Sequence, residues 1–187
     1  PARMITIDGS HGEGGGQLVR MSCALSALTG KPIRLVQVRA RRAPPGLAPQ
    51  HLAAVQAVAQ LCNAATEGLT LRAQEFTFRP GPIRGGDYRF DVGTAGSITL
   101  VLQAVLPVAL AAPAASTLYV IGGTDVKAAP PFDYFRYVYL PLLQRLGLDI
   151  RATLVRRGYY PRGGGEVEVR VQPGRPVPLA LDSPGAL

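Results

Sequence analysis

The same order of apolar segments and glycine-rich turns occurs twice along the chain, and this internal repeat limits the fold more than any other feature of the sequence. Asp8 and Asp91 are 83 residues apart, and Ala43-Pro44-Pro45 and Ala129-Pro130-Pro131 are 86 residues apart. Around these anchors, each half of the chain predicts a strand, a helix, a strand, a helix and two strands. The matched anchors and the shared order indicate an internal duplication.

Apolar spacing and the flanking glycines and prolines locate the elements of each unit. In the first unit we expect helices at 17–29 and 49–64 and strands at 4–7, 33–38, 70–73 and 75–79. In the second unit we expect helices at 97–111 and 132–146 and strands at 88–92, 117–121, 149–155 and 166–171. The predicted fold class is α/β of the α+β type: tandem β-α-β-α-β-β units, each a four-stranded sheet with two helices on one face. Because one such unit buries too little apolar surface, we expect the two units to pack through their helical layers.

The repeat divides the chain into residues 1–85 and 86–175, joined by the glycine- and proline-rich residues 79–87. Residues 176–187, with a strand at 177–181, then predict the start of a third unit that the chain does not contain. The apolar residues of the helix at 97–111 cannot all face one partner; they are Leu100, Leu102, Val105, Leu106, Val108 and Leu110. We therefore expect an apolar flank where a third unit would pack. Such a chain either self-associates through that flank or was trimmed from a larger product.

The composition excludes several classes of protein. Hydrophobic residues make up 47% and charged residues 17%, which excludes intrinsic disorder. The longest apolar stretch, 100–112, is interrupted by Gln103 and Pro107 and is too short to cross a bilayer, so no membrane partner is expected. The first residues lead directly into a strand-like run without a secretory signal, so we expect a cytoplasmic protein. Two cysteines, Cys23 and Cys62, fall among helical apolar positions and predict buried free thiols instead of a disulfide or a zinc site.

The positive charge comes almost entirely from arginine, since Lys31 and Lys127 are the only lysines in a chain of net charge +8. Arginine is the planar, bidentate donor for phosphate, so the charge suggests a polyanionic partner. A GC-rich genome would produce the same richness in arginine and alanine, and composition alone does not separate these two explanations.

A glycine cluster joins the first predicted strand to the first helix. Gly12-Glu13-Gly14-Gly15-Gly16 would let backbone N–H groups approach an anion at the helix start, although it fits neither the P-loop nor the dinucleotide-binding pattern. The alternative is a tight turn with Glu13 placed favourably at a helix start. Glu13 is also able to bind a divalent cation carried by a nucleotide.

An arginine cluster precedes the second helix. Arg39, Arg41 and Arg42 lie in a proline-rich loop just ahead of Gln50 and His51, and Arg20 in the first helix is able to point at the same anion. Arginines near a helix start suit a terminal phosphate or an RNA backbone. A solvated charge cluster with a capping histidine is the alternative.

Three features of the second half are also candidates for a site. Gln103 is an amide within an otherwise apolar helix, and if it is buried it needs a partner from the protein or from a ligand. Pro130 and Tyr134 are placed to stack on a base, or else simply begin a helix. The segment 157–165 is either a binding loop or a flexible turn, which its spacing does not decide.

Together these segments resemble the RNA 3′-terminal phosphate cyclase family. The resemblance covers essentially the whole chain in family order. It rests on Ile7-Asp8-Gly9-Ser10 with Gly12 through Gln17 and Arg20, on Arg39 through Leu47 with Gln50-His51-Leu52, on Gly96-Ser97 with Leu100 through Gln103, on Gly122-Gly123-Thr124-Asp125 with Ala129-Pro130-Pro131, and on Gly158-Tyr159-Tyr160-Pro161 with Gly163-Gly164-Gly165.

The resemblance implies a ligase-class, AMP-forming enzyme that uses ATP and a divalent cation, Mg²⁺ or Mn²⁺, to convert RNA 3′-phosphate ends to 2′,3′-cyclic phosphates. It implies that Glu13 lies near the nucleotide and its metal, with Gln103, Pro130 and Tyr134 at the nucleotide. The phosphates of RNA or ATP would be positioned by Arg20, Arg39, Arg42, Gln50 and His51.

The resemblance also implies that the catalytic nucleophile is missing from this chain. The family's nucleophilic histidine lies in a later repeat, so we expect it beyond Leu187, the last residue of the sequence. Neither His11 nor His51 matches its motif. We therefore expect no catalytic residue within the 187 residues and no adenylylation of the chain alone.

Two other functions remain as alternatives. A catalytically silent cyclase-like protein would bind RNA or assist ribosome assembly, although it would be free to lose the site residues that are present here. A small-molecule transferase built from similar repeats is suggested only by analogy of fold.

Overall fold

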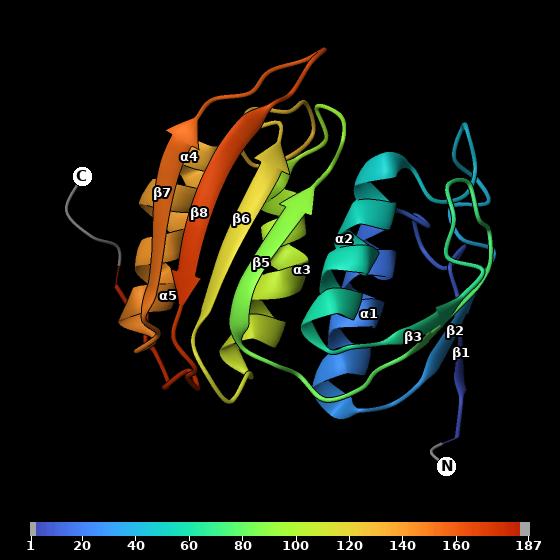
Figure 1. The fold of residues 1–187 in the computed structure, drawn as a ribbon, viewed down its shortest axis with the longest axis horizontal. Coiled ribbons are helices and arrows are strands. Elements are labelled where there is room, and N and C mark those ends of the chain that lie inside the picture. Colours follow the sequence, from blue (N-terminus) through green and yellow to red (C-terminus); the bar gives the residue numbers. More distant parts are fainter. Residues whose placement is uncertain (1–2, 184–187) are drawn as a thin grey trace.

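The computed structural model describes residues 3–183, which form two four-stranded sheets with helices packed between and behind them (Figure 1). The first unit contains, in chain order, β1 (Ile5–Asp8), α1 (Gly16–Thr29), β2 (Ile33–Val36), α2 (Pro49–Leu61), β3 (Ala65–Glu67) and β4 (Phe76–Arg79). The second contains β5 (Gly86–Asp91), α3 (Ile98–Leu110), β6 (Ser116–Gly122), α4 (Phe132–Tyr134), a π-helical turn (Phe135–Tyr139), α5 (Leu140–Arg145), β7 (Ile150–Arg156) and β8 (Gly165–Val171). The predicted fold class is confirmed.

The two sheets have the same connectivity. Their strand orders are β1-β2-β4-β3 and β5-β6-β8-β7, each with one parallel pair followed by two antiparallel pairs. A parallel pair needs a crossover, which α1 supplies in the first unit and α3 in the second. As a result, the carboxyl ends of β1 and β2 lie at one edge of their sheet, next to the N-termini of α1 and α2.

Hydrogen bonds at matched positions show that the repeat extends to the turns. Asp8 and Asp91 each accept a bond from the backbone N–H two residues later, at 2.9 and 2.8 Å, which fixes the turn after the first strand. Gly46 N–H donates to Val38 O at 3.0 Å, and Phe132 N–H donates to Thr124 O at 2.8 Å. The donors Gly46 and Phe132 are 86 residues apart, and so are the acceptors Val38 and Thr124. This is the same offset as between the proline anchors. The two units therefore share their loop geometry as well as their order of elements.

The core lies between the helical layers and against both sheets. Helix α3 packs against both α1 and α2, so the two units meet through their helices as expected. Val19, Val58, Val101 and Val105 are among the fully buried residues of this layer. Both cysteines are buried and free, and burial raises the pKa of Cys62 to about 11. No helix among residues 3–183 is both long enough and apolar enough to span a membrane.

Two predicted strands are wrong. Residues 70–73 form a turn, with Ala73 N–H donating to Thr70 O at 3.1 Å, and the edge strand is Ala65–Glu67 instead. Leu47 from the preceding loop bonds to Arg72 and Ala73 and holds this turn away from the sheet. The segment 177–181 has no strand partner in the described chain. Val177 N–H donates a single bond to Leu146 O, which ties this segment to the end of α5.

Two further predictions concern the end of the chain. Residues 184–187 of the predicted start of a third unit, Leu187 among them, lie outside the described residues. The nucleophilic histidine expected beyond Leu187 likewise lies outside them, so its position stays a prediction.

The predicted apolar flank on α3 is wrong for four of its six residues, and the other two, Leu100 and Leu110, are partly buried. Leu102, Val105, Leu106 and Val108 are all buried because α3 is covered by its own sheet on one side and by α1 and α2 on another. The exposed apolar side chains of the helices lie elsewhere: Leu25 and Leu28 on α1, Tyr134 on α4, and Tyr137, Val138 and Tyr139 on the π-helical turn.

Candidate functional site

The loops that follow β1, β2, β5 and β6 all lie at one end of the molecule, uppermost in Figure 1. Helix N-termini open onto this end, and so do the glycine-rich segments of both units. Gly96 of the second unit faces Gln50 at the start of α2, where an added Cβ would lie 2.9 Å from the Gln50 Cβ. Contact between the loops of the two units thus makes this end a single continuous surface.

The N-terminus of α1 has no side-chain cap. Gly15 occupies the N-cap position, and the first turn contains no acidic residue. The side chain of His51 packs directly against Gly16, where a Cβ would overlap the imidazole ring and lie 3.0 Å from Arg20 Nη1. A helix N-terminus with free N–H groups and a nearby arginine favours an anion.

Arg20 is a buried cation without an internal acceptor among the described residues. The residue is 7% exposed, and its Nε has no hydrogen-bond partner. Burial lowers the pKa of Arg20, since the charged form has lost much of its hydration. A buried charge that is neither paired nor hydrogen-bonded is costly. An anion at the start of α1 would offset this cost.

His51 is neutral at physiological pH. Burial, together with the nearby Arg39 and Arg20, lowers the pKa of His51 to about 4. Ala48 N–H donates to His51 Nδ1 at 3.2 Å, as in the reciprocal half of a capping box, so the proton of the neutral ring lies on Nε2. The ring therefore presents an N–H donor toward Gly16, and its one lone pair is already used by the backbone.

The other arginines of the cluster have different roles. Arg39 Nη1 donates to Gly46 O at 2.7 Å and to Pro44 O at 3.3 Å, so this side chain closes its own loop. Arg39 itself has φ +50°, a left-handed conformation that non-glycine residues rarely adopt. Arg42 is half-exposed, and its Nη2 lies 3.7 Å from Glu13 Oε2. The structure thus brings Arg20, Arg42 and His51 together at the α1 N-terminus, with Glu13 at the rim.

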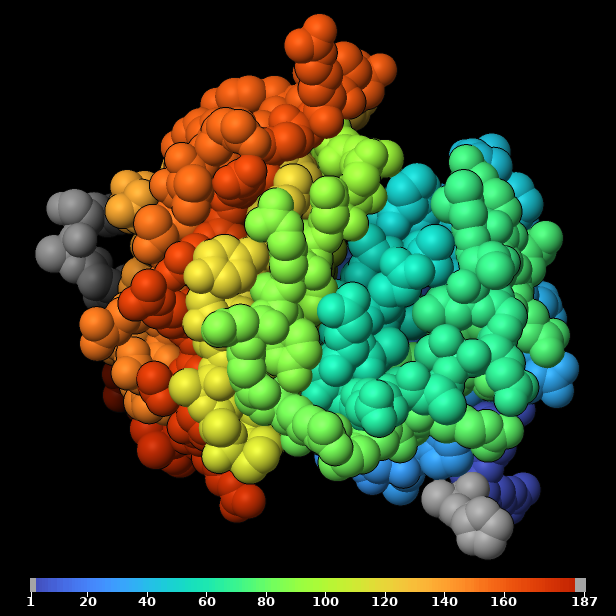
Figure 2. All heavy atoms as spheres, viewed as in Figure 1, coloured from blue at the N-terminus to red at the C-terminus, as the bar shows by residue number. Residues whose placement is uncertain are grey.

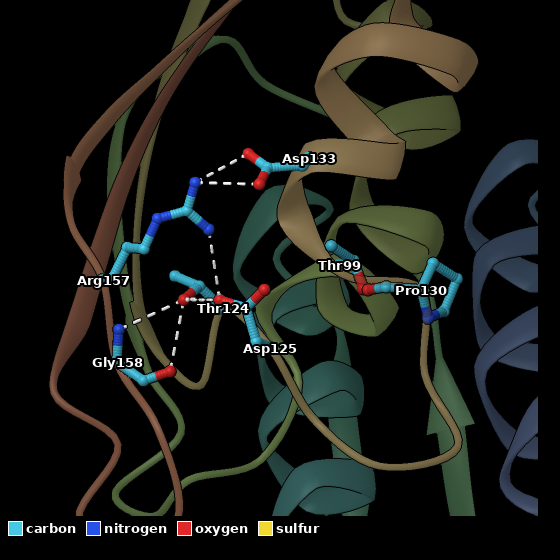
Figure 3. A network of polar contacts seen from close by, with 7 residues as sticks. All are labelled: Thr99, Thr124, Asp125, Pro130, Asp133, Arg157 and Gly158. Atoms are coloured by element: carbon cyan, nitrogen blue, oxygen red, sulfur yellow. Dashed lines mark hydrogen bonds and ion pairs between the residues drawn. The ribbon is translucent and has the colours of Figure 1, made fainter.

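Gln103, Pro130 and Tyr134 line a separate apolar hollow of about 170 Å³, together with Thr99, Leu100, Phe135 and Tyr139. Gln103 is exposed at this hollow, so it is not a buried amide that needs a partner within the protein. Thr99 Oγ1 donates to Pro130 O at 2.6 Å and fixes the proline-rich loop against α3 (Figure 3). Glu13 does not line this hollow.

Glu13 alone does not make a resident metal site. Its side chain is 95% exposed, and residues 3–183 contain no group of three or more potential His, Cys, Asp or Glu ligands. Mg²⁺ requires more oxygen ligands than this one carboxylate, so a cation here would need further oxygen ligands from a bound molecule.

A polar network that the sequence analysis did not identify holds the second unit's loops (Figure 3). Arg157 Nη2 donates to both carboxylate oxygens of Asp133 at 2.8 and 2.9 Å, and its Nη1 lies 3.3 Å from Asp125 Oδ2. The bond to Asp133 is the main reason that the pKa of Arg157 is raised. Thr124 N–H donates to Gly158 O at 2.8 Å, and Gly158 N–H donates to Thr124 Oγ1 at 3.1 Å. Thr124 and Asp125 belong to a motif that the sequence does show, but their partners lie 34 and 32 residues away.

Residues 11–183 match the family model for RNA 3′-terminal phosphate cyclase. The chain belongs to this family. It is 59% identical over 181 residues to the RNA 3′-terminal phosphate cyclase of Nitrosospira multiformis, covering 96% of this chain and 51% of the relative. It is 53% identical over 186 residues to that of Caldivirga maquilingensis, covering 98% and 52%. The chain therefore spans about half the length of these cyclase relatives.

Two solved structures are weakly similar. The enolpyruvyl transferase NikO from Streptomyces tendae has a TM-score of 0.46 and 16% identity, covering 86% of this chain and 30% of that one. The EPSP synthase from Acinetobacter baumannii has a TM-score of 0.41 and 10% identity, covering 92% and 48%. Likeness at this level supports no conclusion about function.

The site residues expected from the resemblance all lie within the segment that matches the cyclase family. The structure divides them into two groups. Arg20, Arg42, His51 and Glu13 surround the α1 N-terminus, while Gln103, Pro130 and Tyr134 surround the hollow beside α3. Arg39 closes the arginine loop, and Gln50 contacts the neighbouring unit.

Proposed function

We propose that this chain supplies the phosphate-end and nucleotide-binding surfaces of an RNA 3′-phosphate cyclase. Membership of the family supports the reaction class. The observation that carries the assignment of the phosphate site is Arg20, a buried guanidinium with an unpartnered Nε at the uncapped start of a helix. A phosphate monoester would supply the missing acceptor and the negative charge in one group.

The proposed reaction activates a poor electrophile. A histidine takes AMP from ATP and releases pyrophosphate. AMP then passes to the RNA 3′-phosphate, and the neighbouring 2′-hydroxyl attacks that phosphorus and expels AMP. Adenylylation is needed because a phosphate monoester dianion lacks a good leaving group. Only RNA has the attacking hydroxyl, so cyclisation itself selects RNA over DNA.

The residues of this chain would bind and orient the reactants. Arg20, Arg42 and the Nε2–H of His51 would donate to the terminal phosphate, alongside the free N–H groups of α1. Arg39 and Gln50 would hold the shape of the loops around it. The hollow beside Gln103, Pro130 and Tyr134 would take the adenine, with ring faces and apolar side chains for stacking. Glu13 would contact the cation carried by ATP.

A binding experiment tests the phosphate site. Short single-stranded RNAs ending in a 3′-phosphate or a 3′-hydroxyl are compared by fluorescence anisotropy with the full 187-residue chain. We expect at least tenfold tighter binding of the 3′-phosphate end, and about a tenfold loss of that preference in Arg42→Ala. Arg151→Ala is the matched control, because it removes the same charge from the opposite end of the second sheet. Equal binding of the two RNAs by the wild-type chain would overturn the proposed phosphate site.

A second experiment tests the proposed position of the nucleophile beyond Leu187. The geometry of His51 supports a binding role, since Nδ1 accepts from Ala48 and Nε2 carries the proton. Incubation with ATP labelled in the α-phosphate and Mg²⁺, followed by denaturing electrophoresis, should leave the chain unlabelled. A covalent AMP adduct would show that the chain contains its own nucleophile, and His51→Gln and His11→Gln would then identify it.

A further inference from the structure

The loop between β7 and β8 projects at the top of Figures 1 and 2. Its residues 157–164 carry two tyrosines and one arginine at the tip. Tyr160 is 87% exposed and Tyr159 is 54% exposed, and Arg162 is exposed between the tyrosines and the glycines that follow. Most of the Tyr160 side chain and about half of Tyr159 are therefore available to a ligand.

The base of this loop is nevertheless firmly held. Gly158 is joined to Thr124 through both its N–H and its carbonyl, and Arg157 is paired with Asp133 and Asp125 (Figure 3). Within the loop, Gly163 N–H donates to Tyr159 O at 2.7 Å. These contacts argue against a flexible turn, because the backbone that carries the tyrosines is fixed on both sides.

The loop also adjoins the phosphate site through a continuous series of contacts. Gly163 packs so closely on the β5–α3 turn that a Cβ would lie 2.5 Å from Thr94 O and 2.9 Å from Ala95 Cα. Gly96 in that same turn faces Gln50, and His51 follows in α2 and contacts Gly16. A single four-residue turn, 93–96, therefore lies between the tyrosine loop and the helix that presents His51.

We propose that Tyr159 and Tyr160 stack on the unpaired bases that precede the 3′-terminal phosphate of a bound RNA, with Arg162 contacting their backbone. Single-stranded RNA is recognised mainly by stacking on aromatic side chains beside basic residues, which is the combination displayed here. The inference rests on the proposed function, since the phosphate site sets the direction in which the RNA strand leaves. It assigns the loop a role in affinity that does not depend on the sequence of the RNA.

The test measures RNA binding by anisotropy with the full chain and RNAs that end in a 3′-phosphate. Tyr160→Ala should weaken binding about tenfold and Tyr159→Ala somewhat less, while Tyr160→Phe keeps its affinity because the ring remains. Tyr137→Ala is the control, since Tyr137 is another exposed tyrosine, 66% exposed on the π-helical turn and outside the loop sequence. Because the substituted side chains are exposed, unchanged thermal unfolding should show that each variant folds.

An RNA with abasic sites at the positions preceding the terminal phosphate completes the test. Stacking predicts that wild type and Tyr160→Ala bind this RNA equally well. Since the chain has no tryptophan, Tyr160→Trp adds one fluorophore, whose emission should be quenched by base-containing RNA and not by abasic RNA. Equal loss of affinity for both RNAs in Tyr160→Ala would overturn stacking, and no loss for either would overturn any role of the loop in RNA binding. A wild-type chain without preference for the 3′-phosphate would overturn the phosphate site itself, which separates the two failures.

Discussion

The two units have the same order of elements, but the N-termini of their first helices differ in capping. Helix α1 begins after Gly15 with no side-chain cap, whereas α3 begins after Ser97, whose Oγ accepts from Leu100 N–H at 3.3 Å. The fifth residue of α1 is the buried Arg20, and the fifth residue of α3 is Leu102, which is fully buried. One copy is thus open to an external anion, and the other is closed by its own hydroxyl group and filled with a hydrocarbon side chain.

The second helices differ in a related way. The third residue of α2 is His51, 4% exposed and neutral, while the third residue of α4 is Tyr134, 51% exposed at an apolar hollow. The duplicated plan therefore places two different chemistries near the starts of the second helices. A polar, anion-directed pocket results in one unit and a ring-lined, apolar pocket in the other. Under the proposed function, the difference in binding comes from a few side chains at the helix starts, because the turns themselves are matched.

The substitution Arg20→Leu places the second unit's residue in the first unit and should have the largest effect. Affinity for RNA with a 3′-phosphate should fall about a hundredfold, since a charge-assisted contact is lost. The free energy of unfolding should rise by about 1–2 kcal/mol, because an unpaired buried charge is replaced by an apolar side chain. Anisotropy and urea denaturation measure the two effects. A variant that loses stability along with affinity would show that Arg20 is already satisfied within the free protein.

The buried histidine predicts a pH dependence that belongs to the first unit alone. Because the pKa of His51 is lowered to about 4, the unfolded chain binds a proton on His51 below about pH 6.5 and the folded chain does not. This residue's contribution is therefore fully present above pH 6.5 and is lost as the pH falls toward 4. Between pH 7 and pH 5 the loss should be about 2 kcal/mol.

Urea denaturation of wild type and His51→Gln across this pH range isolates that contribution, since glutamine still accepts from Ala48 N–H. The difference between the two proteins should grow in favour of His51→Gln as the pH falls. Parallel curves would mean that the proton binds the folded state as readily as the unfolded one.

The substitution Gly15→Ser adds the second unit's cap to the first and should have the smallest effect. Gly15 has extended backbone angles, and a Cβ there would lie 3.7 Å from Arg42 Nη2, so serine fits without strain. Stability should rise by a few tenths of a kcal/mol, and affinity for the phosphate end should fall about threefold as the hydroxyl occupies an N–H group of α1. The reverse change, Ser97→Ala, should cost about 1 kcal/mol without affecting RNA binding. Tighter RNA binding by Gly15→Ser would contradict an open anion site.

The sequence predicts the order of elements well because the repeat supplies two independent observations of each one. The prediction fails for segments whose structure depends on contacts with distant parts of the chain. The polar strand Ala65–Glu67 has no apolar alternation to reveal it, and the turn at 70–73 is held by the Leu47 loop. Similarly, Leu102 and Val108 look like an uncovered flank until the structure shows that α1, α2 and the second sheet together bury most of α3.

The candidate site, like the fold, can be predicted from the sequence only in part. The spacing of Arg20, Arg42 and His51 predicts an anion-binding site. Only the structure shows that Arg20 Nε lacks a hydrogen-bond partner and that Arg39 donates to a carbonyl of its own loop. The sequence places Gln103 on an apolar helix and so leaves its burial undecided, whereas the structure shows it exposed at the hollow beside Pro130 and Tyr134. The Arg157 network joins residues far apart in the chain, which no local pattern reveals.

Each sheet is built only from strands that are contiguous in the chain, residues 5–79 for one and 86–171 for the other. Neither sheet contains a strand from the other half. The two halves therefore contact each other through their helices, as two subunits do at an interface. The short segment between them acts as a tether that keeps the local concentration of each half high for the other. Cutting that tether would turn an intramolecular contact into a bimolecular one, and the apolar helix layer would then decide, by mass action, whether the halves remain together.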